Sequence, residues 1–432
     1  METVGPYLLL PFIAFMLIGV PIAFALAVSV LVFVFFSGTP IRSVVVLTEM
    51  YDGIASVSLL ALPLFILTGE ILNRSDITQK LVTLAARMVG WMIGGLGHVT
   101  VVASMFFAGI SGSAIADAAA LGPLMIPGMV REKFPAAFAA ALTAAAAVIG
   151  PIIPPSIPAI IIGAQLGISI GGLFAAGIIP GIIIGLGLMA ANYTVARRRG
   201  YGEVHPFEGW RSLGSATVDA LPALMVPVLL LGGILSGVFT PTEAGAVSAL
   251  YAALVGAFFY RSLGVTKLRS ALVATARVTG SVLLIYAAAV IFSRILTVQR
   301  IPQELLQVFL ALTQNKVLLV LLVIVLFLIV GMFMDAAVNM VILGPLLMPT
   351  LVQGAGMHPI QFGMFLMVGL LIGLLTPPVG LCLFITAPIA RVSLGAVSVA
   401  CLPFIAVETA VLLLIAFVPE VSLFIPRLLG FV

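Results

Sequence analysis

Two strongly apolar stretches of the chain are interrupted by prolines, glycines and polar residues, and the second stretch repeats the first. The first positions match at a spacing of 222 residues: Gly109, Gly122-Pro123-Leu124 and Pro127 with Gly331, Gly344-Pro345-Leu346 and Pro349. The next match at 223: Gly150 and Pro154-Pro155 with Gly373 and Pro377-Pro378. Broken membrane segments at corresponding positions of two halves are typical of the substrate site of a secondary transporter.

The share of apolar residues predicts that this chain lies in a lipid bilayer. Hydrophobic residues make up 62% of the 432 residues and charged residues only 8%, which leaves too little polar surface for a water-soluble globule. Apolar runs reach the roughly 20 residues that a membrane-crossing helix needs, and we find no alternating strands of about 10 residues. We therefore predict an all-α polytopic membrane protein. The net charge of +4 lies in loops and reports orientation, so no nucleic-acid partner is expected.

The apolar runs predict both repeats and the helices around them. We expect a hairpin of two half-helices over 99–130 with a broken helix over 136–163, and a span that enters a second hairpin over 317–348 with a broken helix over 359–389. Other spans are expected over 7–36, 56–72, 168–195, 279–297 and 394–418, two helices over 221–260, an amphipathic connection at 73–87 and a polar connector at 200–216.

These elements divide the chain into six parts. The parts are N-terminal scaffold helices at 1–98, a first transport repeat at 99–195, a cytoplasmic connector with scaffold helices at 196–278, further scaffold helices at 279–330, a second transport repeat at 331–392, and a C-terminal helix and tail at 393–432. The two apolar cysteines, Cys382 and Cys401, are too few for a disulfide framework or a Cys-rich metal site.

Charge gives the repeat a direction. The turn after the first hairpin is Arg131-Glu132-Lys133, whereas its counterpart at 353–358 has no lysine or arginine. Basic loops favour the cytoplasm, so the two turns are expected on opposite sides of the membrane. The halves are then inverted, related by a pseudo-two-fold axis in the membrane plane. The same count of crossings puts both termini outside.

The proline breaks predict cation sites. A proline cannot donate to the carbonyl four residues earlier, so each break releases carbonyl oxygens at membrane depth. A small hard cation suits such oxygens, and sodium is the simplest choice. The expected ligands of the first sodium site are Ser111, Gly112, Ser113, Gly150, Pro151, Pro154 and Ser156. Those of the second site are Asp335, Asn339, Gly373, Thr376 and Gly380.

The same breaks expose helix N-termini, which favour anions, so a carboxylate substrate is expected between the two sodium sites. The candidate substrate contacts are Arg294, Ser113, Pro155 and Pro378. Arg294 either binds the acid through its guanidinium or only extends to the membrane interface, where Arg300 is close by; both readings remain open. Asp117 is a further carboxylate near the first hairpin tip. The alternative for the prolines is that they only kink helices.

Three more acidic residues lie in apolar surroundings. Glu70 and Glu243 lie near expected helix ends, where capping or interface roles are favoured over transport. Glu408 lies deeper in an apolar run, and we expect it to pair internally.

The residues leave two other classes open. An inverted repeat also suits a stand-alone sodium/anion exchanger or an ion channel. An intramembrane aspartyl hydrolase with Asp117 and Asp335 as its dyad is disfavoured, because the inverted arrangement puts these carboxylates in non-equivalent positions.

Several motifs resemble one known family over essentially the whole chain. They are GISGSAIAD and GPIIPPS in the first repeat, GVFTPTEAGAVSALY, IFSRIL and IPQELL between the repeats, and GMFMD with GLLTPPVG in the second repeat. The chain resembles the large, DctM-like membrane subunit of TRAP transporters (tripartite ATP-independent periplasmic transporters). The resemblance implies a sodium-driven importer of organic acids, such as C4-dicarboxylates or sugar acids, in the bacterial inner membrane. It also implies an elevator-type movement, a separate DctQ-like small membrane subunit and a DctP-like periplasmic substrate-binding protein. It places one sodium ion at Ser111–Ser113 and the break 150–156, and another at Asp335 and the break 373–380.

Overall fold

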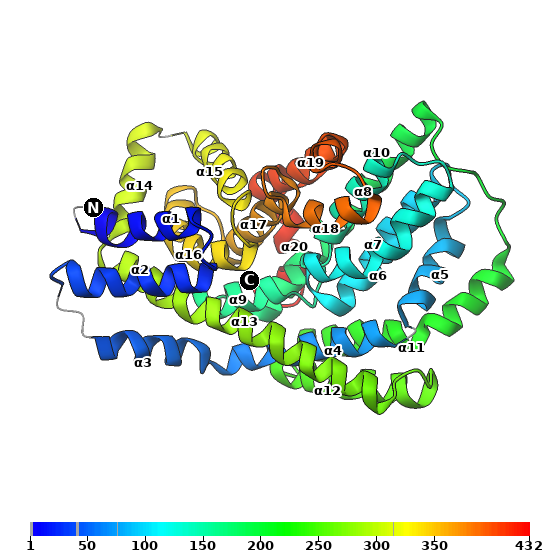
Figure 1. Ribbon diagram of the computed structural model, residues 1–432, viewed down its shortest axis with the longest axis horizontal. Coiled ribbons are helices and arrows are strands. Elements are labelled where there is room, and N and C mark those ends of the chain that lie inside the picture. Colours follow the sequence, from blue (N-terminus) through cyan, green and yellow to red (C-terminus); the bar gives the residue numbers. More distant parts are fainter. Residues whose placement is uncertain (1–2, 40–42, 76, 314) are drawn as a thin grey trace.

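The computed structural model describes residues 3–39, 43–75, 77–313 and 315–432, and every regular element in this part of the chain is helical (Figure 1). Eight helical stretches there are long and apolar enough to cross a membrane, judged by length and composition. They span Val57–Arg74, Ala114–Arg131, Ile170–Arg199, Trp210–Leu235, Pro241–Phe259, Val265–Val298, Ala336–Gly354 and Leu394–Phe417. The predicted all-α class is confirmed.

The first apolar segment folds back on itself. A π-helical turn, Gly5–Leu9, leads into α1 (Leu10–Leu17), and α2 (Ile22–Phe36) then returns beside it (Figure 1). The prediction of one span over 7–36 is wrong, because Gly19 has a φ of +83° and the chain reverses there. Glycine adopts this left-handed conformation without steric cost, and the proline at position 21 disfavours helix in the residue before it.

A layer of scaffold helices forms one long side of the molecule. It contains α3 (Ser43–Ile54), which the sequence did not reveal, the 3₁₀ turn Val57–Leu60 with α4 (Ala61–Arg74), α11 (Trp210–Leu235), α12 (Pro241–Leu254) and α13 (Val265–Val298) (Figure 1). Helix α4 packs against both α12 and α13. The amphipathic helix α5 (Ile77–Val89) joins this layer to the first repeat and packs against α11 and α6.

Helix α13 is longer than predicted. Its 34 residues include Lys267, Arg269 and Arg277, which the sequence suggested would precede the span. At 1.5 Å per residue the helix is about 51 Å long, well over the roughly 30 Å of hydrocarbon in a bilayer. The first turns of α13, which carry these basic residues, therefore lie outside the apolar layer of the membrane.

Both predicted repeats are present, with boundaries close to those expected. The first contains α6 (Gly95–Ser111), α7 (Ala114–Arg131), α8 (Ala136–Val148), α9 (Ile157–Leu166) and α10 (Ile170–Arg199). The second contains α15 (Lys316–Gly331), α16 (Ala336–Met348), α17 (Pro359–Ile372), α18 (Leu381–Ala390) and α19 (Leu394–Phe417). We call these two sets of helices the repeat core. Helix α14 (Ile301–Leu312) precedes the second repeat, and α20 (Glu420–Leu428), which was not predicted, follows it.

Contacts that helices of the first repeat make with the second repeat have counterparts made by the equivalent helices of the second repeat, as a two-fold relation requires. Helix α7 of the first hairpin packs against α18, and α16 of the second hairpin packs against α9. In the same way α8 contacts α19, while α17 contacts α10.

The two turns that follow the hairpins lie at opposite ends of the molecule. The first turn contacts the connector 200–209, where Lys133 Nζ lies 2.8 Å from the Glu203 carboxylate and His205 lies 3.0 Å from Glu132. The second turn begins within the π-helical segment Pro349–Gly354, which packs against α14 at the other end (Figure 1). The repeats are therefore inverted, as the charges of the two turns predicted.

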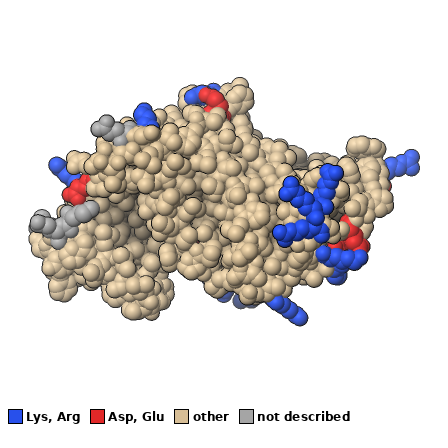
Figure 2. Space-filling view, turned by 90° about the horizontal axis from the view of Figure 1, so that it is seen from above, with Lys and Arg blue, Asp and Glu red and all other residues tan. Residues whose placement is uncertain are grey.

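Lysine and arginine side chains gather at one end of the molecule, the end at which α10 finishes (Figure 2). The last turn of α10 carries Arg197, Arg198 and Arg199. The positive-inside rule assigns this end to the cytoplasm.

Candidate functional site

In the first repeat, the hairpin tip meets the break of the broken helix. The backbone N–H of Ile157 donates to the carbonyl oxygen of Gly112, with 3.4 Å between the two atoms. Gly112 has a φ of +61°, and a Cβ atom at this position would lie 2.6 Å from the carbonyl oxygen of Pro155. Only glycine combines this backbone conformation with such a close approach. The proximity of Ser111–Ser113 to the break, which the sequence predicted, is therefore present.

A buried carboxylate joins the tip to the start of the break. The hydroxyl of Ser111 donates to Asp117 Oδ1, and Asp117 is completely buried. Its Oδ2 atom has no hydrogen-bond partner among the described residues and faces Gly150, where a Cβ atom would overlap it. The sequence set Asp117 apart from the candidate sodium ligands, but the structure groups it with Ser111 and Gly150. Its position one helical turn after Ser113 was the available signal.

Serine residues begin both helices of the first repeat that start at the site. Ser113 Oγ accepts the N–H of Ala116 at the start of α7, and Ser156 Oγ accepts that of Ala159 at the start of α9. The Ser156 hydroxyl also donates to the carbonyl of Pro151. That carbonyl, expected to be free for a cation, thus already accepts one hydrogen bond. Pro154 is joined to Pro155 by a cis peptide bond.

The second repeat brings the corresponding segments together. Asp335 Oδ1 accepts the N–H of Ala337 at 2.9 Å and so caps α16. The backbones of Gly331 and Gly373 touch, since a Cβ atom on Gly331 would lie 2.9 Å from the Cα of Gly373. The hydroxyl of Thr376 donates to the carbonyl of Ile372 at 3.0 Å.

The remaining candidates of the second site are Asn339, Gly380 and the prolines of the break. Asn339 is buried and donates its side-chain amide to the carbonyl of Met334, 3.3 Å away. Gly380 adopts a φ of +56° at the start of α18. Pro377 and Pro378 are joined by a cis peptide bond, as in the first break.

One cavity of about 400 Å³ connects both hairpin tips and faces the scaffold. Its lining includes Ser111, Gly112 and Ser113 of the first tip, Asp335 of the second tip, and Glu70 of α4. Helices α7, α9 and α16 all begin at this cavity. Because helix N-termini carry unpaired N–H groups, three such ends in one cavity favour an anion.

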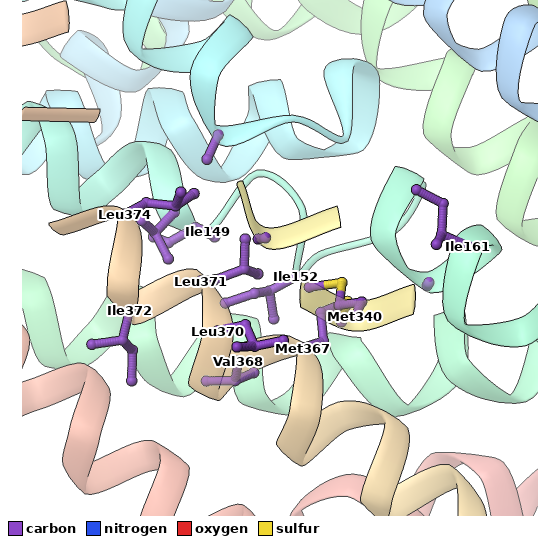
Figure 3. Close-up of a cluster of buried hydrophobic side chains, with 14 of the residues drawn as sticks. Ile149, Ile152, Ile161, Met340, Met367, Val368, Leu370, Leu371, Ile372 and Leu374 are labelled. Carbon is purple, nitrogen blue, oxygen red and sulfur yellow. The ribbon is translucent and has the colours of Figure 1, made fainter. Parts of the chain in front are cut away.

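A cluster of buried apolar side chains packs the two breaks against each other. Ile149 and Ile152 follow α8, and Figure 3 shows them beside Leu371 and Leu374, which belong to the end of α17 and the turn after it. These four side chains are at most 3% exposed. Burying each one stabilises the fold by about 1.5–3 kcal/mol, so the cluster fixes the geometry of the site above it.

The predicted substrate contacts do not all reach this cavity. Ser113 lines it, but Pro155, Pro378 and Arg294 are not among its described lining residues. Arg294 lies on α13, where its guanidinium is 3.0 Å from the carboxylate of Glu49. It lines a second cavity of about 410 Å³ between α3, α9, α13 and α16. Its contact with substrate remains a prediction.

The other acidic residues lie partly as expected. Glu243 forms a capping box with Thr240 at the start of α12, which confirms the capping role. Glu70 pairs with Arg74 and also lines the central cavity, so it lies closer to the site than the sequence suggested. Asp117 and Asp335 each form hydrogen bonds within their own repeat, which is not the arrangement of a shared-proton dyad.

An inverted pair of hairpins and broken helices around one central cavity defines a multi-pass membrane transporter. The chain belongs to the family described as the tripartite ATP-independent periplasmic transporter, DctM component, whose model matches residues 9–421. This confirms the family that the motifs suggested, and its members are transporter components and not enzymes.

Three relatives illustrate the match. The chain is 36% identical to the sialic acid TRAP transporter large permease protein of Vibrio cholerae, covering 95% of each chain. It is 37% identical to the C4-dicarboxylate large permease protein of Pseudomonas aeruginosa, covering 91% of this chain and 92% of the relative. It is 39% identical to the isethionate TRAP transporter permease protein DctMQ of Oleidesulfovibrio alaskensis, covering 96% of this chain but 65% of that relative.

A solved structure shares the fold. The YdaH transporter of Alcanivorax borkumensis superposes with a TM-score of 0.64 at 16% identity, covering 95% of this chain and 98% of the other. At this identity the likeness concerns the fold alone.

Proposed function

We propose that the chain is the membrane subunit of a sodium-coupled importer of organic acids in a bacterial inner membrane. The observation that carries this proposal is the central cavity, where three helix N-termini and two hairpin tips meet. The three relatives described above are named for isethionate, sialic acid and C4-dicarboxylates, and each of these substrates is an acid. An organic acid is therefore the expected substrate class.

The charges at the cavity give a physical reason for sodium coupling. The carboxylate of Asp335 lines the cavity, Asp117 lies just behind Ser111, and the described lining contains no lysine, arginine or histidine; Glu70 also lines it but pairs with Arg74. An organic anion would be repelled by these groups unless cations were bound first. Sodium ions held by hydroxyl, carbonyl and carboxylate oxygens at the two tips would remove that repulsion. Substrate binding then requires sodium.

The first site would use Ser111, Asp117 and the backbone of Gly112 and Gly150. The second would use Asp335 with backbone oxygens near Gly373 and the hydroxyl of Thr376. The two sites are related by the inverted repeat, so each hairpin tip closes over one cation.

Movement of the repeat core against the scaffold would carry the cavity across the bilayer. The cavity lies between the two, since α4 and α13 contribute Glu70, Val278 and Val282 to its wall. An elevator-type displacement would slide the tips along this wall while each tip keeps its own sodium site. The hydrogen bond between Ile157 and Gly112 and the backbone contact between Gly331 and Gly373 would be preserved during this movement.

Two partners belong to this proposal. A periplasmic binding protein would deliver the acid, and a small membrane subunit would support the scaffold. The relative named DctMQ is longer than this chain, which spans 65% of it.

The test is uptake by proteoliposomes that contain the complex of both membrane subunits. Radiolabelled isethionate, sialic acid and a C4-dicarboxylate are offered with the cognate binding protein, with an inward sodium gradient or with potassium replacing sodium. We expect uptake of one acid only with sodium and only with the binding protein. Sodium-independent uptake would contradict the coupling, and uptake without the binding protein would favour a stand-alone exchanger or channel. A thermal-shift screen of the binding protein identifies the acid to use.

A further inference from the structure

Glu408 is a buried acid that the proposed sodium sites do not use. It lies in the middle of α19 and is 0% exposed. Neither carboxyl oxygen has a hydrogen-bond partner among the described residues. The sequence predicted an internal partner for this side chain, and that prediction is wrong for the described part of the chain.

The elements packed against α19 offer no counter-charge close to Glu408. They are α8, α10, α17, α18, α20 and the turn Gly373–Leu375. Their titratable and charged side chains are Cys382 of α18, Tyr193 and Arg197–Arg199 of α10, and Glu420 and Arg427 of α20. The α10 arginines are exposed in its last turn, and Arg427 pairs with Glu420. Helix α19 itself adds Cys401, and His358 caps α17.

The buried face of α19 around Glu408 is apolar. Cys401, about two helical turns earlier on the same helix, and Cys382 of α18, which packs against α19, are completely buried. Phe404, Val411 and Leu412, one helical turn away on either side, are at most 3% exposed. A sodium ion needs several oxygen ligands, whereas a proton needs only one. An ionised carboxylate without a partner in such surroundings is strongly disfavoured.

We propose that Glu408 is a proton-binding site of the repeat core, separate from the two sodium sites. The bound proton leaves a neutral carboxylic acid at the centre of α19. On the proposed function, the repeat core then holds three carboxylates, Asp117 and Glu408 in its interior and Asp335 at the cavity, balanced by two sodium ions and one proton. The core crosses the bilayer without an unpaired charge from this residue.

Infrared spectroscopy of the purified membrane complex near neutral pH tests this directly, because protonated and ionised carboxyl groups absorb in different bands. Glu408→Gln removes one carboxylic-acid band and leaves the carboxylate bands unchanged. Cys401→Ser is the matched control, since it alters a buried neighbour on the same helix and keeps the acid band. If Glu408→Gln removes carboxylate absorption instead, Glu408 is ionised and the proposal is overturned.

Sodium binding separates this inference from the proposed function. Sodium-induced thermal stabilisation is measured for the wild-type complex and for Glu408→Gln, with equal apparent sodium affinity expected. A tenfold or larger loss of affinity in the variant would make Glu408 a sodium ligand and overturn the proton site. If the wild type shows no sodium effect, the proposed function fails while the infrared result still decides the protonation of Glu408.

If Glu408 is a neutral acid, uncharged replacements at this position should fold. Glu408→Gln and the apolar Glu408→Met both insert and melt close to the wild type, because neither removes a charge. Failure of both variants to fold would show that the ionised group is required, and would also overturn the proposal.

Discussion

Ile157 donates its backbone N–H to the carbonyl oxygen of Gly112, 3.4 Å away, and so joins the tip of the first hairpin to the helix that follows the first break. In the second repeat the hairpin is joined to its break at another point, the direct backbone contact between Gly331, the last residue of α15, and Gly373. Each tip is thus fixed to a break of its own repeat. Any cation held between a tip and its break would move with that repeat as one body.

Gly112→Ala tests whether this junction forms a cation site. The alanine must adopt a φ near +61° and place its Cβ against the carbonyl oxygen of Pro155. The left-handed conformation costs about 1–2 kcal/mol, and the overlap must in addition push the tip away from the break. We expect a fall in melting temperature and at least a tenfold loss of apparent sodium affinity, measured by sodium-dependent thermal stabilisation.

Gly167→Ala is the matched control. Gly167 has a similar φ of +66°, but a Cβ atom there would meet nothing within 4 Å. This variant bears the conformational cost without the overlap, so its sodium affinity stays at the wild-type value. Equal sodium affinities for the two alanine variants would remove the junction from the sodium site.

Asp335→Ala tests the second cation site. The substitution removes the carboxylate that lines the central cavity and caps α16, while the hydrophobic contacts of the hairpin remain. We expect the sodium concentration for half-maximal uptake to rise at least tenfold, which corresponds to about 1.4 kcal/mol, with normal insertion in the membrane. Asp219→Ala, which removes an exposed partner of Lys80, serves as the control. Unchanged sodium dependence in Asp335→Ala would exclude it as a ligand.

The fold of the repeats could be predicted because membrane helices follow a simple physical rule. The length of each apolar run predicted the membrane spans, and the prolines that follow Gly150 and Gly373 predicted the breaks. The first segment was misread because a run of 30 apolar residues suits either one tilted span or two short helices. The choice depended on the reversal at Gly19, and its positive φ is visible only in three dimensions.

The site was predicted in part. Motif position identified Ser111–Ser113 and Asp335, whereas the inclusion of Asp117 depends on the direction of its side chain toward Ser111 and Gly150. Helical spacing alone does not give that direction, since α7 offers several faces to neighbouring helices. The ion pair of Arg294 with Glu49 could not be predicted from the sequence either, because α3, which carries Glu49, was not predicted.

Arg294→Ala tests whether this side chain binds substrate. If the guanidinium binds the carboxylate of the acid on its way through the second cavity, its loss abolishes sodium-driven uptake. Glu49→Gln is the informative comparison, since it breaks the ion pair but leaves Arg294 in place. Substrate binding predicts loss of uptake only in Arg294→Ala. Equal effects of the two substitutions would assign Arg294 a structural role as the partner of Glu49.

Tyr286→Phe tests whether a contact between scaffold and repeat core limits their relative movement. The hydroxyl of Tyr286 on α13 donates to Gln165 Oε1 on α9 at 3.0 Å, and both residues line the second cavity. A hydrogen bond of this kind contributes about 0.5–1.5 kcal/mol, so its loss would shift the equilibrium between conformations about two- to tenfold away from the one described here. We expect faster labelling of a cysteine introduced at Ser293, in the same cavity, by a membrane-impermeant thiol reagent. Tyr251→Phe, on α12 outside this cavity, should leave the labelling rate unchanged. Identical labelling rates in both variants would show that the Tyr286 hydroxyl does not restrain the repeat core.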